Sequence, residues 1–189
     1  MKRRKFLKSV LGVAGLSMAA TGTVIPSIAQ ATSRRQIISK VIEPRILSFR
    51  NAHTNEMFTG VYKVGDTYLE DSLDQINYVL RDHRQNLVHP IDKDLIDLAH
   101  YIHTQSGQHR EYEILSGYRS PKTNKMLRRT SSGVARKSMH VQGKAVDLRI
   151  PGYSTHKLKR IAVDMKAGGV GYYKGSNFMH LDTGKVRVW

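Results

Sequence analysis

The sequence contains no cysteine. A disulfide framework and a cysteine-ligated zinc site are therefore both excluded, and any metal site has to be built from histidine and carboxylate side chains. Acidic residues are also few, since 15 Asp and Glu stand against 31 Lys and Arg and leave a formal net charge of +16. Such an excess of positive charge fits an anionic partner, which could be a nucleic acid, an anionic membrane surface or an anionic cell-wall polymer.

The N-terminus lacks an apolar run long enough for a stable membrane-spanning helix. Its apolar stretch at residues 10–20 is broken by Gly12 and Gly15, whereas a spanning helix needs about 20 predominantly apolar residues. A basic start precedes this stretch and the small-residue pattern Ala29–Ala31 follows it, as in a cleavable secretion signal. We therefore expect residues 1–31 to be a signal peptide and expect no stable membrane span after its removal.

The start of this signal carries a more specific pattern. Arg3 and Arg4 are followed by Phe6 and Leu7, which is typical of twin-arginine signals, the route associated with export of already folded proteins. The alternatives are an ordinary secretory signal and a basic tail before a short membrane anchor. A twin-arginine signal predicts a periplasmic protein. This location argues against nucleic acid as the anionic partner and favours cell-wall peptides or anionic lipid.

Removal of the signal leaves a chain of one-domain size. Cleavage after Ala31 leaves 158 of the 189 residues, with 26 basic and 15 acidic side chains and thus a net charge of +11. A chain of this length suits one domain with a single core. Residues 32–44 are polar and basic and end at Pro44, so we expect a linker there and the folded domain at residues 45–189.

The order of the expected elements indicates an α+β domain. Helical patterns dominate its first half and short strands alternate with turns in its second half, which predicts a small, mostly antiparallel sheet covered by helices. The expected elements are a β-hairpin at residues 45–64, helices beginning at Asp66–Thr67 and at Asp92, strands at 112–115, 145–150, 170–173 and 178–182, and helices at 121–129 and 154–166.

The densest chemical signal lies at residues 138–148, where His140 precedes Asp147 by seven positions. Asp147 stands between two apolar residues of an expected strand, so its side chain should point to the face opposite theirs. A carboxylate beside an apolar core is costly unless a cation or several donors compensate it. Gly143 would let the backbone turn sharply enough to bring His140 over the same face.

A third potential ligand lies in the last expected strand, where His180 and Asp182 share one face. Two histidines and one carboxylate leave the fourth tetrahedral position of Zn²⁺ open, as a catalytic site requires. Zinc would polarise a carbonyl and lower the pKa of its water toward ~7, which suits amide hydrolysis. From the residues alone, a chance spacing of His140 and Asp147 and a hydrogen-bonded core histidine at His180 stay open as alternatives.

The letters around these residues extend the signal. The pattern S-x-H-x2-G-x-A-x-D at residues 138–147, with the later His180, resembles the zinc D-alanyl-D-alanine peptidases. These enzymes belong with the lysostaphin-like enzymes and the hedgehog domain in one superfamily of small α+β zinc proteins. The segment Ser116–Ser120 matches the strand-end motif of the same group.

A closer resemblance covers most of the chain. The stretch from residue 115 to residue 189, with GGVGYY at 168–173 and HLDTG at 180–184, is similar to the YcbK/MepK family of murein endopeptidases. The similarity extends more weakly back to Pro44. It implies that His140, Asp147 and His180 are the zinc ligands and that the substrate is the peptide cross-link of peptidoglycan.

The resemblance also suggests three substrate-binding residues, Tyr118, Arg119 and Ser138. Arg119, which follows Tyr118 after an expected strand, can bind a substrate carboxylate through two parallel hydrogen bonds; alternatively it forms a surface ion pair. Ser138 either bonds the substrate backbone or shapes the turn before His140. A basic rim that could attract an anionic polymer, or that is simply solvated, consists of Lys122, Lys125, Arg128, Arg129, Arg136 and Lys137.

One departure concerns the catalytic base. The related carboxypeptidases carry a glutamate a few residues before the final histidine, whereas residues 176–179 here contain no carboxylate. Asp182 is therefore the candidate for a proton shuttle or for orienting a ligand, although it could instead accept hydrogen bonds from the turn that follows it.

The residues predict a zinc metallopeptidase, and the resemblance implies that it hydrolyses peptide cross-links in peptidoglycan. The missing glutamate keeps a second hypothesis open, a zinc-stabilised domain that binds wall peptides without cutting them, since this fold also hosts non-hydrolytic roles. A third hypothesis, a nucleic-acid binder, is supported by the positive charge alone. The lack of aromatic residues interleaved with the basic ones argues against it.

Overall fold

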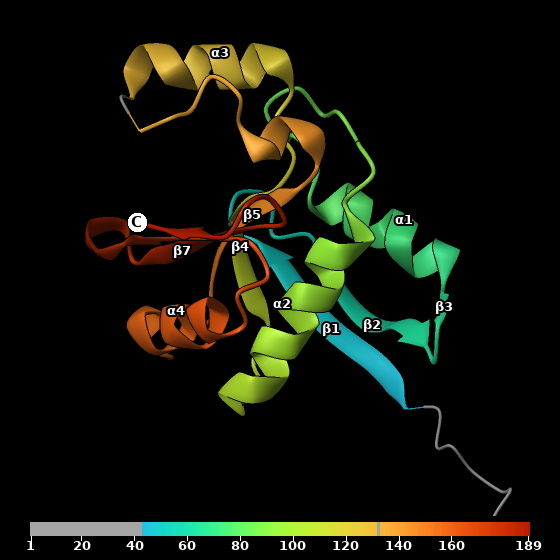
Figure 1. Ribbon diagram of the computed structural model, residues 1–189. Coiled ribbons are helices and arrows are strands. Elements are labelled where there is room, and N and C mark those ends of the chain that lie inside the picture. The colour runs from blue at the N-terminus through green and yellow to red at the C-terminus, as the bar shows by residue number, and fades with distance from the viewer. Residues whose placement is uncertain (1–42, 132) are drawn as a thin grey trace, which may run out of the picture. The chain divides into compact units, whose positions relative to one another are not determined.

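The computed structural model describes residues 43–131 and 133–189, so the expected signal peptide at 1–31 and nearly all of the expected linker at 32–44 lie outside the described residues. An eight-stranded mixed sheet runs through the described part in the order β3-β2-β1-β4-β5-β7-β6-β8 (Figure 1). The strands are β1 (Pro44–Asn51), β2 (Met57–Val64), β3 (Thr67–Tyr68), β4 (Tyr112–Ser116), β5 (Ala145–Arg149), β6 (Gly169–Tyr173), β7 (Phe178–Asp182) and β8 (Arg187–Val188).

The helices lie between the third and the seventh strand along the chain. They are α1 (Glu70–Val79), α2 (Lys93–Ser106), α3 (Pro121–Thr130) and α4 (Thr155–Asp164), together with the short 3₁₀ helices η2 (Met139–Gln142) and η3 (Lys174–Ser176). Within the described ranges, no helix has both the length and the apolar character needed to cross a membrane.

The predicted α+β class and the mostly antiparallel pairing are confirmed, but the sheet is larger than the small sheet expected. The reason is that the N-terminal hairpin of β1 and β2 joins the site-bearing strands through parallel pairing of β1 with β4. At the hairpin turn, the Asn55 amide donates to the Asn51 carbonyl at 2.9 Å. Asn55 has a φ of 58°, a left-handed conformation that asparagine tolerates better than most residues.

Helices α1 and α2 begin differently. The Asp92 side chain caps α2 by accepting the amide of Asp94 at 3.1 Å, as predicted. Gly107 ends the helix with a φ of 64°. The expected cap of α1 at Asp66 and Thr67 is wrong, because Thr67–Tyr68 instead pairs with the end of β2 as strand β3. Helix α1 therefore begins at Glu70, after Leu69, without a side-chain cap.

Strands β5 and β7 separate a core face from a polar face. Leu148 pairs with Met179 and both are fully buried, and Leu158 of α4 belongs to the same core cluster. Because side chains alternate along a strand, the paired residues Asp147 and His180 point to the other face. In Figure 1, α3 and α4 lie on opposite sides of these strands, so the polar face is directed toward α3.

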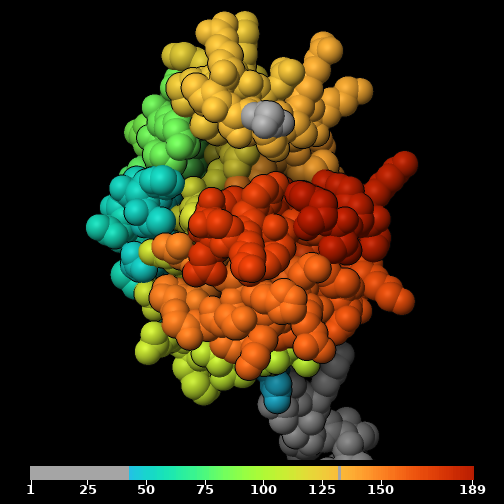
Figure 2. Space-filling model, turned by 90° about the vertical axis from the view of Figure 1, so that its left-hand side faces the viewer, coloured from blue at the N-terminus to red at the C-terminus, as the bar shows by residue number. Residues whose placement is uncertain are grey.

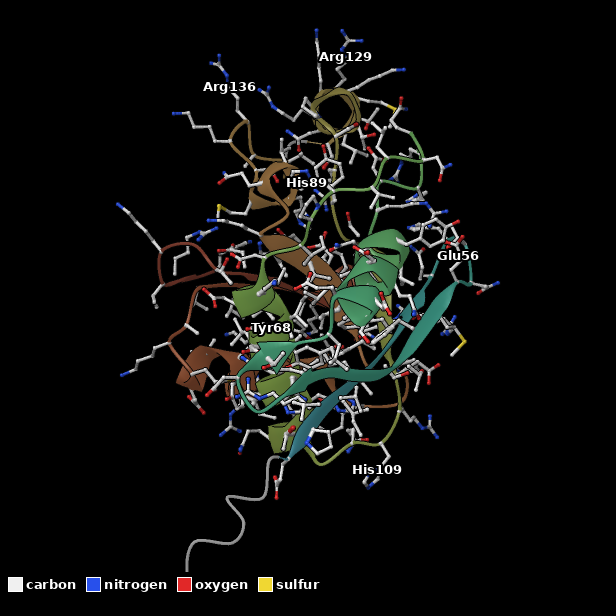
Figure 3. The ribbon with its side chains drawn as sticks, turned by 90° about the vertical axis from the view of Figure 1, so that its right-hand side faces the viewer. Glu56, Tyr68, His89, His109, Arg129 and Arg136 are labelled. Carbon is white, nitrogen blue, oxygen red and sulfur yellow. The ribbon has the colours of Figure 1, made fainter. Side chains whose placement is uncertain are left out.

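A polar network around Asp97 ties α2 to the hairpin. The Asp97 carboxylate accepts Tyr62 Oη at 2.8 Å, Lys63 Nζ at 2.9 Å and Tyr68 Oη at 3.0 Å, and Arg45 lies 2.8 Å from it. Tyr68 is labelled in Figure 3. Burial by itself raises the pKa of Asp97. The hydrogen bonds from Lys63 and the two tyrosines lower it by more than burial raises it, so the net pKa lies below its usual value.

We expect Asp97→Asn to lower the free energy of unfolding by about 2 kcal/mol at pH 7, because the largely buried Lys63 loses its counter-ion. The folded-state pKa of Asp97 is depressed, so this stabilisation is complete above its unfolded pKa of about 4 and is lost as the pH falls through the folded pKa. Urea unfolding at pH 7 and pH 3 measures the difference. The exposed Asp164→Asn is the matched control, and an equal cost for Asp97→Asn at both pH values would contradict the assignment.

Candidate metal centre

Three separate elements supply the potential ligands. His140 lies in η2, Asp147 lies in the middle of β5 and His180 lies in β7, and each is almost completely buried. Asp147 and His180 are direct partners in the antiparallel β5/β7 ladder. Paired residues in such a ladder project from the same face of the sheet, so the strand register alone brings these two side chains together.

The turn at Gly143 brings the third side chain to them. Gly143 has a φ of 67°, and the Lys144 amide donates to the Met139 carbonyl at 3.0 Å, which reverses the chain between η2 and β5. A Cβ atom at position 143 would lie 2.3 Å from the Pro90 carbonyl oxygen. Glycine is thus required here both by conformation and by space, and the turn holds His140 over the face that carries Asp147.

The ligand atoms converge on one point. His180 Nδ1 lies 2.9 Å from Asp147 Oδ1, and His140 Nε2 lies 3.3 Å from the same oxygen. The two imidazole nitrogens are 3.2 Å apart, and one ligand atom from each of the three residues lies within 4.8 Å of the others. Two imidazole nitrogens and one carboxylate oxygen at these separations fit a single divalent metal ion.

The outward-facing nitrogen of each imidazole has its own partner. His140 Nδ1 lies 2.8 Å from the Gly117 carbonyl oxygen, and His180 Nε2 lies 2.8 Å from Asp182 Oδ2. Partners of this kind fix the tautomer and the orientation of a metal-binding histidine. They direct His140 Nε2 and His180 Nδ1 toward the shared centre.

Asp182 is buried behind His180 and does not line the cleft. Its exposure is 0%, and besides His180 it accepts the amides of Gly169 at 3.2 Å and Gly184 at 2.8 Å. Arg187 Nη2 donates to its Oδ2 at 2.6 Å. Burial raises the pKa of Asp182, but the bonds from His180 and Arg187 lower it well below the usual range. Asp182 is therefore an ionised hydrogen-bond acceptor behind His180.

The charged and polar groups around the centre keep Asp147 ionised. Burial raises the pKa of this carboxyl, but His140, His180 and Arg119 lower it well below its usual range. Burial lowers the pKa of His140, so its imidazole is neutral at pH 7. For His180, the lowering by burial is outweighed by hydrogen bonds with Asp147 and Asp182, and its pKa is raised. A metal ion would compete with a proton for His180 Nδ1.

The predicted substrate-binding residues occupy three different positions. Arg119 lies at the centre itself, where its Nη2 donates to Asp147 Oδ2 and its Nε donates to Ser116 Oγ at 2.7 Å. Ser138 is buried and lines the cleft in front of His140. The Tyr118 ring instead stacks on His89 with 4.4 Å between the ring centroids, and it is absent from the described residues that line the cleft.

A cleft of about 350 Å³ opens above the three ligands. One wall is formed by residues of the segment 131–139 and the other by Tyr173, Phe178 and Trp189. Figure 2 shows this face, with the segment after α3 above the C-terminal segment. The Trp189 ring lies 5.2 Å from the His180 ring, measured between centroids. A Cβ at Gly171 would come within 2.6 Å of the Trp189 indole, so this glycine of β6 makes room for the wall.

Sequence reasoning did not identify several residues that shape the site. Arg187 and Trp189 follow the last strand without a recognisable motif, and the Gly117 contribution is a backbone carbonyl. The alternating glycines at 169 and 171 were the available signal, because two glycines on one strand face indicate close approach by other groups.

Comparisons with known proteins identify relatives of this chain. Residues 39–189 match the family model for peptidoglycan L,D-endopeptidase MepK. The probable peptidoglycan L,D-endopeptidase MepK of Haemophilus influenzae is 45% identical over 148 residues, which cover 78% of this chain and 80% of the relative. Peptidoglycan L,D-endopeptidase MepK of Escherichia coli K12 is 36% identical over 182 residues, 96% of either chain. No solved structure shows significant similarity to the chain.

Proposed function

The chain belongs to the peptidoglycan L,D-endopeptidase MepK family, and from this we propose that it is a zinc-dependent hydrolase of the peptide cross-links in peptidoglycan. One observation carries the proposal. His140, Asp147 and His180 converge at the floor of an open cleft, and both imidazoles are oriented by outer partners.

The donor set supports zinc as the metal. Two imidazole nitrogens and one carboxylate oxygen are typical of catalytic zinc sites that keep one position open. Zinc held there would supply Lewis-acid chemistry, which polarises a peptide carbonyl and activates water at neutral pH. The chain therefore needs no serine or cysteine nucleophile.

Arg119 is proposed to position the substrate. Its Nε and Nη2 are engaged by Ser116 and Asp147, whereas its Nη1 has no partner among the described residues. Because Arg119 lines the cleft, this remaining donor can bind a substrate carboxylate or the negative oxygen that develops at the scissile carbonyl. Ser138, on the wall of the same cleft, is proposed to contact the substrate backbone, and Tyr118 to support the Arg119 loop by stacking on His89.

Asp182 is proposed as a positioning residue. Its complete burial and its bonds to His180, Arg187 and two amides leave it without access to the substrate. The ligand-orienting role fits these contacts, and the proton-shuttle role does not. The turn after β7 also contributes, because the Gly184 amide bonds to the same carboxylate.

We also propose that the protein acts outside the cytoplasm, in the periplasm. A cell-wall substrate requires export, and the twin-arginine pattern at Arg3 and Arg4 provides a route for it.

Purified protein without its signal peptide should convert cross-linked muropeptide dimers to monomers, and a chelator should abolish the conversion until zinc is returned. Mass spectrometry of the products measures the outcome and identifies the bond that is cut. Retention of dimers by the zinc-loaded protein without cleavage would instead favour a non-catalytic wall-peptide binding domain. The absence of a glutamate before His180 is the observation that motivates this alternative.

A further inference from the structure

A segment without any acidic residue forms one side of the cleft. Residues 114–146 contain eight Lys or Arg and no Asp or Glu. Its projecting part, which we call the cationic lobe, consists of α3 and residues 131 and 133–137. The lobe stands apart from the sheet in Figure 1, and Arg129 and Arg136 extend outward from it in Figure 3. Its exposed cations are Lys122, Lys125, Arg128, Arg129, Arg136 and Lys137.

These cations are not compensated within the fold. None of the six forms an ion pair with a carboxylate of the described residues, whereas Arg50, Lys63 and Arg81 in the rest of the domain do. All fifteen acidic residues belong to the described ranges. The lobe therefore presents a positive field to the solvent, and such a field attracts and concentrates anionic partners.

Packing does not account for the composition of α3. The helix buries only Thr123 and Asn124, and Met126 is the one large apolar side chain exposed on the described part of the lobe. A surface that binds through burial of apolar area would expose more such side chains. The lobe is thus suited to electrostatic contact with a hydrated polyanion and poorly suited to insertion into lipid.

The lobe is continuous with the cleft. Ser131, Val134 and Lys137 line the cleft opposite Tyr173 and Trp189. A polymer bound in the cleft therefore lies beside the lobe, and parts of the polymer that extend past this wall can contact α3.

We infer that the cationic lobe docks the carboxylate-bearing peptidoglycan polymer beside the cleft, an inference that rests on the proposed function. Uncut peptide stems carry carboxylates, which lysine and arginine bind through charge-assisted hydrogen bonds. The lobe retains the insoluble polymer while the metal centre acts on one cross-link. Its contribution is to affinity for the polymer, separate from the chemical step.

The test compares two variants that each lose two lysines and one arginine. The lobe variant carries Lys122→Gln, Lys125→Gln and Arg128→Gln. The control variant carries Lys157→Gln, Arg160→Gln and Lys166→Gln, which are on or directly after α4, on the other side of the sheet. Co-sedimentation with insoluble peptidoglycan measures docking, and hydrolysis of soluble muropeptide dimers measures the chemical step and confirms folding.

The lobe variant should bind insoluble peptidoglycan about tenfold more weakly than the control variant at low salt. The difference should disappear near about 1 M salt, where the screening length falls to about 3 Å. Equal binding by the two variants at low salt would overturn the inference. The inference would also be overturned if the lobe variant bound peptidoglycan as well as the control variant did but bound vesicles containing anionic lipid more weakly. If zinc-loaded wild type fails to cleave dimers but the binding difference persists, the proposed function fails and the docking surface stands.

Discussion

Replacing Asp147 by alanine is expected to abolish metal binding. In the proposed site the carboxylate supplies one of three ligand atoms, and it also holds His180 at 2.9 Å and accepts a hydrogen bond from Arg119. Its loss leaves only two imidazoles, which bind zinc far more weakly than three ligands do. Loss of a hydrogen-bond partner behind a metal ligand already lowers metal affinity or activity about 10–100-fold. Loss of a ligand itself should therefore lower both zinc affinity and activity by more than that.

Metal content per protein chain, measured by elemental mass spectrometry after dialysis, should fall from about one zinc ion to a trace. Cleavage of muropeptide dimers should fall with it. The variant Asp147→Asn preserves the side-chain volume beside Arg119 and guards against loss of folding, and the exposed Asp164→Ala is the control for the removal of an acidic residue. Stoichiometric zinc in both Asp147 variants would show that the ligand assignment is wrong.

Replacing Asp182 by asparagine is expected to keep the metal site but weaken it. The variant is nearly isosteric, so the backbone amides of Gly169 and Gly184 can still find an acceptor. The negative charge of the group that contacts His180 Nε2 is lost, however, and this weakens one of the two carboxylate contacts that orient the ring. We expect a 10–100-fold decrease in zinc affinity or in turnover, the range for partners behind metal ligands.

Competition with a chromophoric chelator measures the zinc affinity, and turnover at saturating zinc measures the remaining effect on chemistry. Arg187→Gln is the matched control, because it removes another partner of Asp182 and leaves the bond to His180 in place. A smaller change in zinc affinity for Arg187→Gln than for Asp182→Asn supports the positioning role. If Asp182→Asn lowers thermal stability without changing zinc affinity or turnover, the residue is merely structural.

The sequence was most informative where the signal is local. The expected helix at Asp92, the hairpin, and the strands around Asp147 and His180 all agree with the structure, because caps, turns and alternation depend on neighbouring residues. The start of α1 was predicted wrongly because it depends on a contact that is not local. Whether Thr67–Tyr68 caps a helix or forms a strand depends on pairing with β2, which the local pattern does not encode.

By itself, the sequence determined the chemistry that is available to this protein. The absence of cysteine restricts any metal site to histidine and carboxylate ligands. Two such ligands, His140 and Asp147, are seven positions apart, and Gly143 between them marks a turn that can bring their side chains together. Composition also determined that the surface is strongly basic. These properties depend on residue identity and short-range geometry, which the chain carries before it folds.

Only the tertiary structure decided how the remaining groups are used. The register of β5 with β7 places His180 beside Asp147, and the register of β6 with β7 encloses Asp182 completely. Stacking on His89 directs Tyr118 away from the cleft, while Trp189 becomes its wall. Each of these outcomes depends on contacts between segments far apart in the chain, where a one-residue change of register would turn every side chain to the opposite face.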